Sequence, residues 1–247
     1  MALREIEHKG NTFKISYEIF PPKKEIKKDI IFLHGWGSNK EIMKVFKQDF
    51  EEFRQIYIDM PGFGKSNAPI SLTTFDYAKI IDAFLLDINA KKDVIISHSF
   101  GGKVGLLLKP KLLVLLASAG ILEKKPASVR FKIILYKLLK KLTGAKFRDF
   151  FVSKDVKGMG EVMYLTFKNV VNENFNEIFK SYDGEVLIFG AKQDKAVTPN
   201  AIKQQSQHLN TNYKIFDGEH YFFLDTKNRK ELVRLIKERM RDEQPKR

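Results

Sequence analysis

Six short apolar runs recur along the chain, and segments rich in glycine or polar residues separate them. The runs are residues 29–33, 55–59, 94–97, 111–117, 185–190 and 212–216. Most of these runs are continuously apolar, as expected of strands in a parallel sheet, because helices cover both faces of such a sheet. The pattern therefore predicts several parallel strands that share one buried sheet.

Residues 12–20 follow a different pattern, in which apolar and polar positions alternate up to a pair of prolines at 21–22. A period of two is typical of an antiparallel strand with one solvated face, and proline ends such a strand. We expect an antiparallel strand here, at the edge of the sheet.

Apolar residues three and four positions apart predict helices between the strands. The predicted helices are residues 73–88, 103–109, 200–209 and a last one that ends at about 241. The alternation of strand and helix predicts an α/β fold: a mostly parallel, twisted sheet of about eight strands, flanked by helices, in which the first strands are antiparallel.

The strand pattern is missing from residues 121–182. Apolar residues there form one helical face opposite lysines, at Phe131, Ile134, Leu135, Leu138, Leu139 and Leu142. We expect one domain over residues 1–247, since α/β domains often reach this length, with residues 121–182 inserted as a helical lid.

Composition restricts the possible partners. The net charge is +14, yet the two densest basic stretches, residues 23–28 and 137–146, lack the interleaved aromatics of a nucleic-acid surface, and we expect no nucleic-acid partner. The chain has no cysteine, which excludes disulfides and thiolate metal sites.

The N-terminus does not resemble a signal peptide, and the most apolar run, residues 112–122, is too short to span a bilayer. We expect a cytoplasmic protein.

The strand at residues 94–97 leads into the pattern small-x-Ser-x-Gly, with Ser99 at its centre and Gly101 at its end. An apolar helical segment follows at once. A serine at such a strand-turn-helix junction projects its hydroxyl from the sheet, and the N–H groups of the helix N-terminus point into the same space. Ser99 is therefore a candidate nucleophile.

Three other strands end in polar loops. Residues 34–38 read His-Gly-Trp-Gly-Ser, residues 190–199 contain Asp194, and residues 217–225 contain His220. In these motifs, and from about residue 12 to 240, the chain resembles the α/β-hydrolase superfamily, whose catalytic residues follow the order Ser, Asp, His. The resemblance implies that Ser99, His220 and Asp194 act as nucleophile, base and orienting acid.

The same resemblance assigns the oxyanion hole to the backbone N–H groups of Trp36 and Phe100, and it implies neither a cofactor nor a metal. A serine hydroxyl needs an imidazole to remove its proton, and a carboxylate must hold that imidazole in one tautomer. The attacked carbonyl becomes an oxyanion that needs preplaced donors.

Several residues compete for these roles. Asp217 and Asp225 are rival acids, although Asp225 stands where a helix cap is expected. His34 is expected to support the backbone of its loop, and His98 to point away from the reaction. Ser97 replaces the glycine that is usual at this turn, and we expect slight strain there.

The primary hypothesis is a serine hydrolase, a carboxylesterase that cleaves a small to medium carboxylic ester through an acyl-enzyme on Ser99. The expected partners are a small-molecule ester and, given the basic surface, an acidic carrier protein. One alternative is a carbon–carbon bond hydrolase of the meta-cleavage type, which basic side chains such as Arg130 or Arg148 in the pocket would favour. The other alternative is a non-catalytic binding protein on the same fold.

Overall fold

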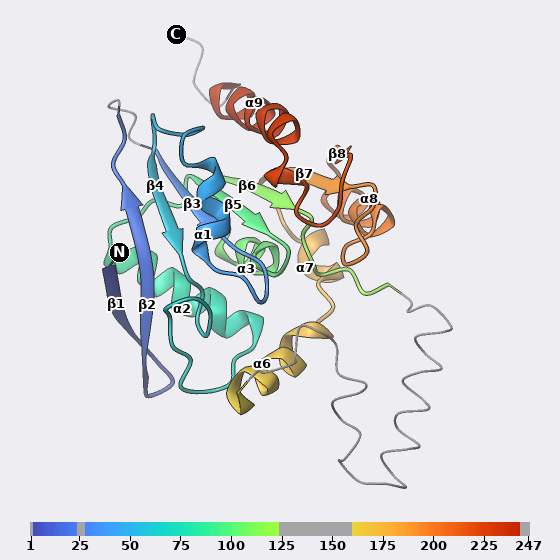
Figure 1. Cartoon of the computed structure of the whole chain (residues 1–247). Coiled ribbons are helices and arrows are strands. Elements are labelled where there is room, and N and C mark those ends of the chain that lie inside the picture. Colours follow the sequence, from blue (N-terminus) through green and yellow to red (C-terminus); the bar gives the residue numbers. More distant parts are fainter. Residues whose placement is uncertain (1, 24–27, 124–159, 243–247) are drawn as a thin grey trace, which may run out of the picture.

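The computed structural model describes residues 2–23, 28–123 and 160–242, which form a sheet flanked by helices (Figure 1). The sheet has eight strands in the order β1-β2-β4-β3-β5-β6-β7-β8. The strands are β1 (Ala2–His8), β2 (Asn11–Phe20), β3 (Asp29–Leu33), β4 (Arg54–Ile58), β5 (Val94–His98), β6 (Leu112–Leu116), β7 (Glu185–Ala191) and β8 (Tyr213–Phe216). Strand β2 is antiparallel to β1 and β4, and strands β3 to β8 are parallel to one another, so the predicted sheet is confirmed.

The predicted edge position of β2 is wrong, because β1 lies outside it. Strand β1 pairs with β2 along its whole length, with Ile6 opposite Phe13. Ile6 is the one buried residue of β1, while Leu3 is about half exposed. An outer strand that buries a single side chain shows no apolar alternation, and hydrophobic patterning therefore missed it.

The helices are α1 (Lys40–Met43), α2 (Thr74–Asp87), α3 (Phe100–Leu108), α6 (Glu161–Val171), α7 (Asn176–Lys180), α8 (Pro199–Leu209) and α9 (Thr226–Asp242), with 3₁₀ turns at Lys44–Phe46 and Phe222–Leu224. Helix α2 begins in a capping box, in which Thr73 and Asp76 bond to each other's backbone N–H groups. Helix α3 begins three residues earlier than predicted, directly after Ser99. This early start places the N-terminus of α3 at the candidate nucleophile.

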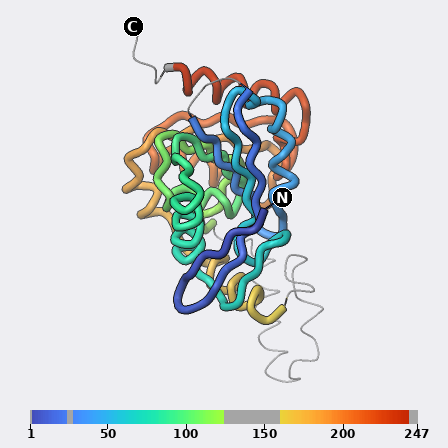
Figure 2. Tube along the Cα trace, turned by 90° about the vertical axis from the view of Figure 1, so that its left-hand side faces the viewer, coloured from blue at the N-terminus to red at the C-terminus, as the bar shows by residue number. Residues whose placement is uncertain are grey.

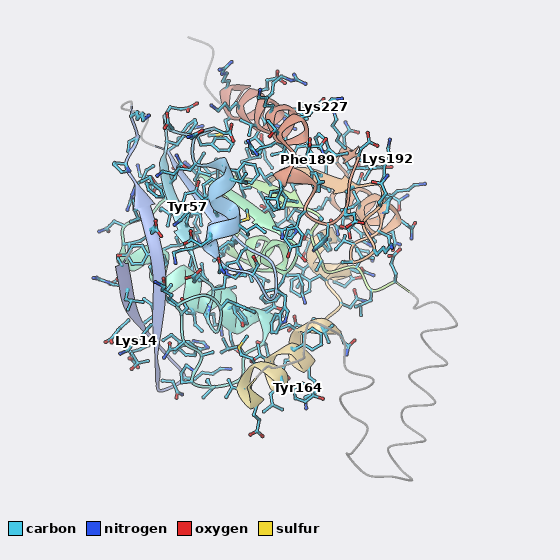
Figure 3. The ribbon with its side chains drawn as sticks, in the orientation of Figure 1. Lys14, Tyr57, Tyr164, Phe189, Lys192 and Lys227 are labelled. Atoms are coloured by element: carbon cyan, nitrogen blue, oxygen red, sulfur yellow. The ribbon has the colours of Figure 1, made fainter. Side chains whose placement is uncertain are left out.

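Helices α2 and α3 lie on one side of the sheet and α1 lies on the other (Figure 2). Helix α9 packs against the region that follows α1, where Arg229 bonds to Asp49 at 3.2 Å and Lys237 to Glu52 at 2.6 Å. Strands β3, β5 and β6 are buried at every residue, as their continuous apolar runs predict. In Figure 3, Tyr57 and Phe189 lie inside this core, and Lys14, Lys192 and Lys227 lie at the periphery.

Of the predicted lid, residues 121–182, the structure describes 121–123 and 160–182, which contain α6 and α7 and no strand. The helical face expected at 131–142, together with Arg130 and Arg148, lies outside the described residues. Among the residues that are described, no helix is long and apolar enough to cross a membrane.

Candidate active site

Ser99 occupies the turn between β5 and α3 with φ 51° and ψ −115°. A non-glycine residue at positive φ in such a conformation costs about 1–3 kcal/mol, and the surrounding structure must hold it there. The Ser99 N–H donates to the carbonyl of Leu116, and the N–H groups of Gly102 and Ala119 donate to the Ser99 carbonyl, each at 3.0 Å. These three hydrogen bonds fix the strained turn from both sides.

The backbone of the loop after β3 packs closely against the turn at Ser99. A Cβ atom on Gly101 would lie 2.7 Å from the carbonyl oxygen of His34, and one on Gly35 would lie 3.1 Å from the Cβ of Ser99. Only glycine permits this approach at both positions. Sequence reasoning assigned Trp36 and Phe100 to one site, and the close contact of the two loops brings these residues together around Ser99.

Ser97, the departure from the usual glycine, is fully buried in β5. Its hydroxyl donates to the carbonyl of Val114 on the neighbouring strand at 2.9 Å. Its φ is not positive, unlike that of Ser99. The bonded hydroxyl explains how serine is accommodated, and the unusual backbone conformation lies at Ser99 and not at Ser97.

Asp194 and His220, from the loops after β7 and β8, lie side by side. The Nδ1 of His220 is 2.7 Å from Oδ2 of Asp194, which is almost fully buried. The N–H groups of Ala196 and Val197 donate to the other carboxylate oxygen at 2.8 and 2.9 Å. An ionised carboxylate accepts hydrogen bonds only, so Nδ1 of His220 carries the proton and Nε2 is left as the acceptor.

The rival acids are engaged elsewhere. Asp217 is exposed and pairs with Lys192. Asp225 stands just before α9 and accepts the N–H of Asn228 at 2.9 Å, so the predicted helix cap is confirmed. Of the three candidate acids, Asp194 is the one bonded to His220.

His98 contacts His220 through its own ring. Its Nε2 lies 3.1 Å from the backbone carbonyl of His220, and the two ring centroids are 4.5 Å apart. Burial lowers the pKa of His98 well below its ordinary value, and the neighbouring His220 lowers it further. His98 is therefore neutral, with the proton on Nε2 donated to the carbonyl. Sequence reasoning gave His98 no role at the site, because this contact joins residues far apart in the chain.

His34 holds the loop that carries Trp36. The Met60 N–H donates to Nε2 of His34 at 3.0 Å, so Nδ1 carries the proton and donates to the Gly35 carbonyl at 2.8 Å. Burial lowers the pKa of His34 to about 4. The Gly35 carbonyl and the Trp36 N–H belong to one planar peptide group and point in opposite directions. Fixing the carbonyl therefore fixes the direction of the Trp36 N–H, and the expected support of the loop by His34 is confirmed.

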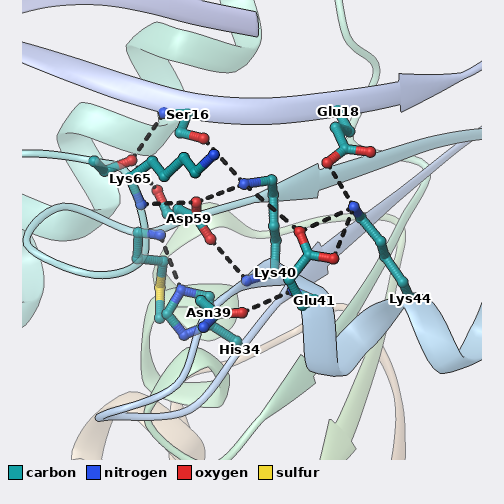
Figure 4. A network of polar contacts seen from close by, with 11 residues as sticks. Ser16, Glu18, His34, Asn39, Lys40, Glu41, Lys44, Asp59 and Lys65 are labelled. Atoms are coloured by element: carbon teal, nitrogen blue, oxygen red, sulfur yellow. Dashed lines mark hydrogen bonds and ion pairs between the residues drawn. The ribbon is translucent and has the colours of Figure 1, made fainter. Parts of the chain in front are cut away.

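A buried ion pair lies beside this loop (Figure 4). Lys40 Nζ is 2.6 Å from Asp59 Oδ2 and 3.0 Å from the Ser16 hydroxyl. The backbone N–H groups of Lys40 and Lys65 also donate to Asp59, at 2.8 and 3.0 Å. Burial by itself would raise the pKa of Asp59, but these hydrogen bonds and the Lys40 charge lower it overall. The network joins β2 to the loops after β3 and β4.

A cavity of about 290 Å³ opens at Ser99, between α3, α6 and the loop after β6. Trp36 and Phe100 line it together with Ser99. Most of the remaining lining among the described residues is apolar, and includes Ile121, Leu122, Phe167, Val170, Val171 and Val197. Asp194 and His220 line an adjoining, more open hollow of about 990 Å³. Within the described ranges, no group of three or more His, Asp or Glu residues is placed to bind a metal ion.

The chain is similar to known proteins in sequence and in structure. Residues 29–110 match the family model of the alpha/beta hydrolase fold. A protein of Mycoplasma pneumoniae named as an esterase/lipase is 30% identical over 108 residues, which are 42% of this chain and 40% of that protein. The pimeloyl-[acyl-carrier protein] methyl ester esterase of Pseudoalteromonas atlantica is 30% identical over 103 residues, 39% of each chain. The chain thus spans well under two thirds of either relative.

The solved structure of an esterase from Exiguobacterium antarcticum superposes with a TM-score of 0.72 at 17% identity. The superposition covers 93% of this chain and 96% of the esterase. This likeness extends well beyond residues 29–110, the segment that the family model matches. The chain therefore has the α/β-hydrolase fold.

Proposed function

We propose that the protein is a serine hydrolase that cleaves a small to medium carboxylic ester, with Ser99 as nucleophile, His220 as base and Asp194 as orienting acid. One observation carries this proposal: the 2.7 Å hydrogen bond from His220 to the buried Asp194, together with a serine in the strained turn before α3, whose preceding residue His98 contacts His220. A purely structural serine would not need that backbone conformation.

In the proposed reaction, Nε2 of His220 takes the hydroxyl proton as Ser99 Oγ attacks the ester carbonyl. The tetrahedral intermediate collapses when the ester C–O bond breaks, and His220 gives its proton to the leaving alcohol. Water, activated by His220, then cleaves the acyl-enzyme and releases the carboxylic acid. Asp194 stabilises the imidazolium that forms in each half of the reaction.

The oxyanion is bound by the N–H groups of Trp36 and Phe100. Phe100 is the first residue of α3, and the first N–H groups of a helix have no partner within the helix and lie at its positive end. The Trp36 N–H is oriented through the hydrogen bond from His34 to Gly35. Losing one oxyanion donor typically costs about 2.7–4 kcal/mol of barrier.

The size and lining of the cavity support a small to medium acyl group. Its volume of about 290 Å³ equals that of about ten water molecules, at ~30 Å³ each. The apolar lining suits the acyl chain of a small to medium ester. Similarity to a pimeloyl-[acyl-carrier protein] methyl ester esterase and the net charge of +14 support an acidic carrier protein as the partner that delivers the substrate.

Hydrolysis of p-nitrophenyl butyrate tests the proposal. The wild type should turn the ester over and should label with a fluorophosphonate, and Ser99→Ala should do neither. Equal turnover by both proteins would refute Ser99 as the nucleophile. Labelling distinguishes a hydrolase from a non-catalytic binding protein on this fold, because only an activated serine reacts.

A further inference from the structure

A lysine lines the cavity close to Ser99. Lys103 is in the first half of α3, one helical turn beyond Ser99, and its side chain is only 3% exposed. Its ammonium donates to the Val170 carbonyl and to the Glu173 carboxylate, each at 2.7 Å, and lies 4.5 Å from the centre of the Phe175 ring. Burial lowers the pKa of Lys103, and the Glu173 charge opposes that effect. The cavity that contains Ser99 is thus lined by a buried positive charge, and its effect on substrate binding depends on the groups that surround it.

Glu173, which follows α6, is held in place by more than Lys103. Its carboxylate also accepts hydrogen bonds from the backbone N–H, at 3.2 Å, and the hydroxyl of Thr74 at the start of α2. Its side chain is 19% exposed and lines the same cavity. The ion pair therefore joins α2, α3 and the end of α6, and it presents a neutralised charge to the cavity.

The described lining of the cavity offers a substrate anion a single positive charge, that of Lys103, which Glu173 already balances. Apart from Lys103 and Glu173, the one charged residue in the described part of its lining is Glu123. Glu123 accepts hydrogen bonds from the side chains of Thr198 and Asn200, at 2.6 and 2.7 Å. The described lining thus carries one ammonium and two carboxylates.

An acyl chain that ends in a carboxylate would lose its water on entering this cavity. It would then meet an ammonium whose charge Glu173 already balances, together with the negative charge of Glu173 itself. Burying an anion without a counter-charge is costly, whereas an uncharged chain has no such desolvation penalty. Selection against an unwanted ligand by a like charge is a common basis of specificity.

We propose that Glu173 is a specificity-determining residue that neutralises Lys103 and so restricts the site to uncharged acyl groups. The inference rests on the proposed ester hydrolysis. Without Glu173, Lys103 becomes an unpaired cation near the nucleophile, and the carboxylate of a substrate takes the place of the missing partner.

Two substrates of equal chain length test this proposal: p-nitrophenyl hexanoate and the mono-p-nitrophenyl ester of adipic acid. For the wild type, kcat/KM should be at least about tenfold higher on the hexanoate. Glu173→Gln should raise the ratio of adipate to hexanoate kcat/KM by about tenfold or more, and adding Lys103→Met should cancel that rise. The matched control is Glu177→Gln, which changes an exposed glutamate of α7 that lies outside the cavity lining.

A gain on one substrate relative to another cannot arise from partial unfolding, which lowers both rates together. A wild type that accepts both esters equally overturns the proposal even if Glu173→Gln does not fold. An unchanged ratio in a folded Glu173→Gln, or a rise that persists with Lys103→Met, also overturns it. Failure of the proposed function looks different, because in that case the wild type hydrolyses neither ester or Ser99→Ala retains the activity.

Discussion

The backbone carbonyl of His220 accepts a hydrogen bond from Nε2 of His98, the residue that directly precedes Ser99, at 3.1 Å. The bond ties the loop after β8 to the end of β5. The base and the nucleophile of the proposed reaction come from sequence positions more than a hundred residues apart, and His98 connects them through one buried ring. We therefore regard His98 as a positioning residue for His220.

Replacing His98 tests this relationship. His98→Phe keeps an aromatic ring but removes the donor to the part-buried carbonyl of His220, and positioning the base without this hydrogen bond should raise the barrier by about 1–3 kcal/mol. We expect kcat on p-nitrophenyl butyrate to fall by roughly 10- to 100-fold, since about 1.4 kcal/mol corresponds to a factor of ten, with little change in KM.

His98→Gln is the matched variant, because its side-chain amide can supply an N–H donor. It should recover a large part of kcat. If His98→Phe and His98→Gln lose kcat equally, or if the loss follows the melting temperature alone, His98 has only a packing role.

Asp194→Asn should keep the shape of the site but replace the acceptor that holds the Nδ1 proton of His220. The imidazole then loses the partner that stabilises its charged form, and in a serine protease the corresponding change lowers kcat by about 10⁴. We expect a fall of roughly 10³- to 10⁴-fold in kcat. Asp217→Asn provides the control, because Asp217 is an exposed residue paired with Lys192. Comparable losses from both variants would contradict the assignment of Asp194.

Stability should fall as the pH is lowered, because of His34. Its folded-state pKa of about 4 lies below the ordinary 6.5, so between these values the unfolded chain binds a proton that the folded chain does not. The free energy of unfolding therefore rises with pH in this window, and His34 alone accounts for about 3 kcal/mol between pH 6.5 and pH 4. His98, whose pKa burial also lowers, acts in the same direction.

Urea titrations at pH 7 and pH 5 measure this dependence. Wild-type stability should be lower at pH 5, and His34→Gln should reduce the difference between the two pH values while lowering stability at both. An identical difference in His34→Gln would show that other groups cause the pH dependence.

The parallel strands and the polar residues at their ends were predictable, because buried parallel strands leave continuous apolar runs and the loops after them contain Ser99, Asp194 and His220. Strand β1 was not predictable, since it buries only Ile6. Lys103 was not either: a lysine within an apolar helix gives no sign that Glu173, seventy residues later, neutralises it. Contacts between distant segments depend on packing, which local sequence patterns do not encode.

The buried pair of Lys40 and Asp59 should matter for both stability and activity. Removing one partner leaves an uncompensated buried charge, and such changes typically cost about 3–5 kcal/mol. Asp59→Asn should therefore lower the free energy of unfolding by several kcal/mol, and so should Lys40→Met. Because the pair fixes the loops that carry His34 and Met60, the Trp36 N–H should lose its orientation, and kcat should fall further than the folded fraction does.

The double variant Lys40→Met with Asp59→Asn should be less destabilised than the sum of the single variants, since it leaves no unpaired charge. Strictly additive losses in urea unfolding would mean that the two residues act independently.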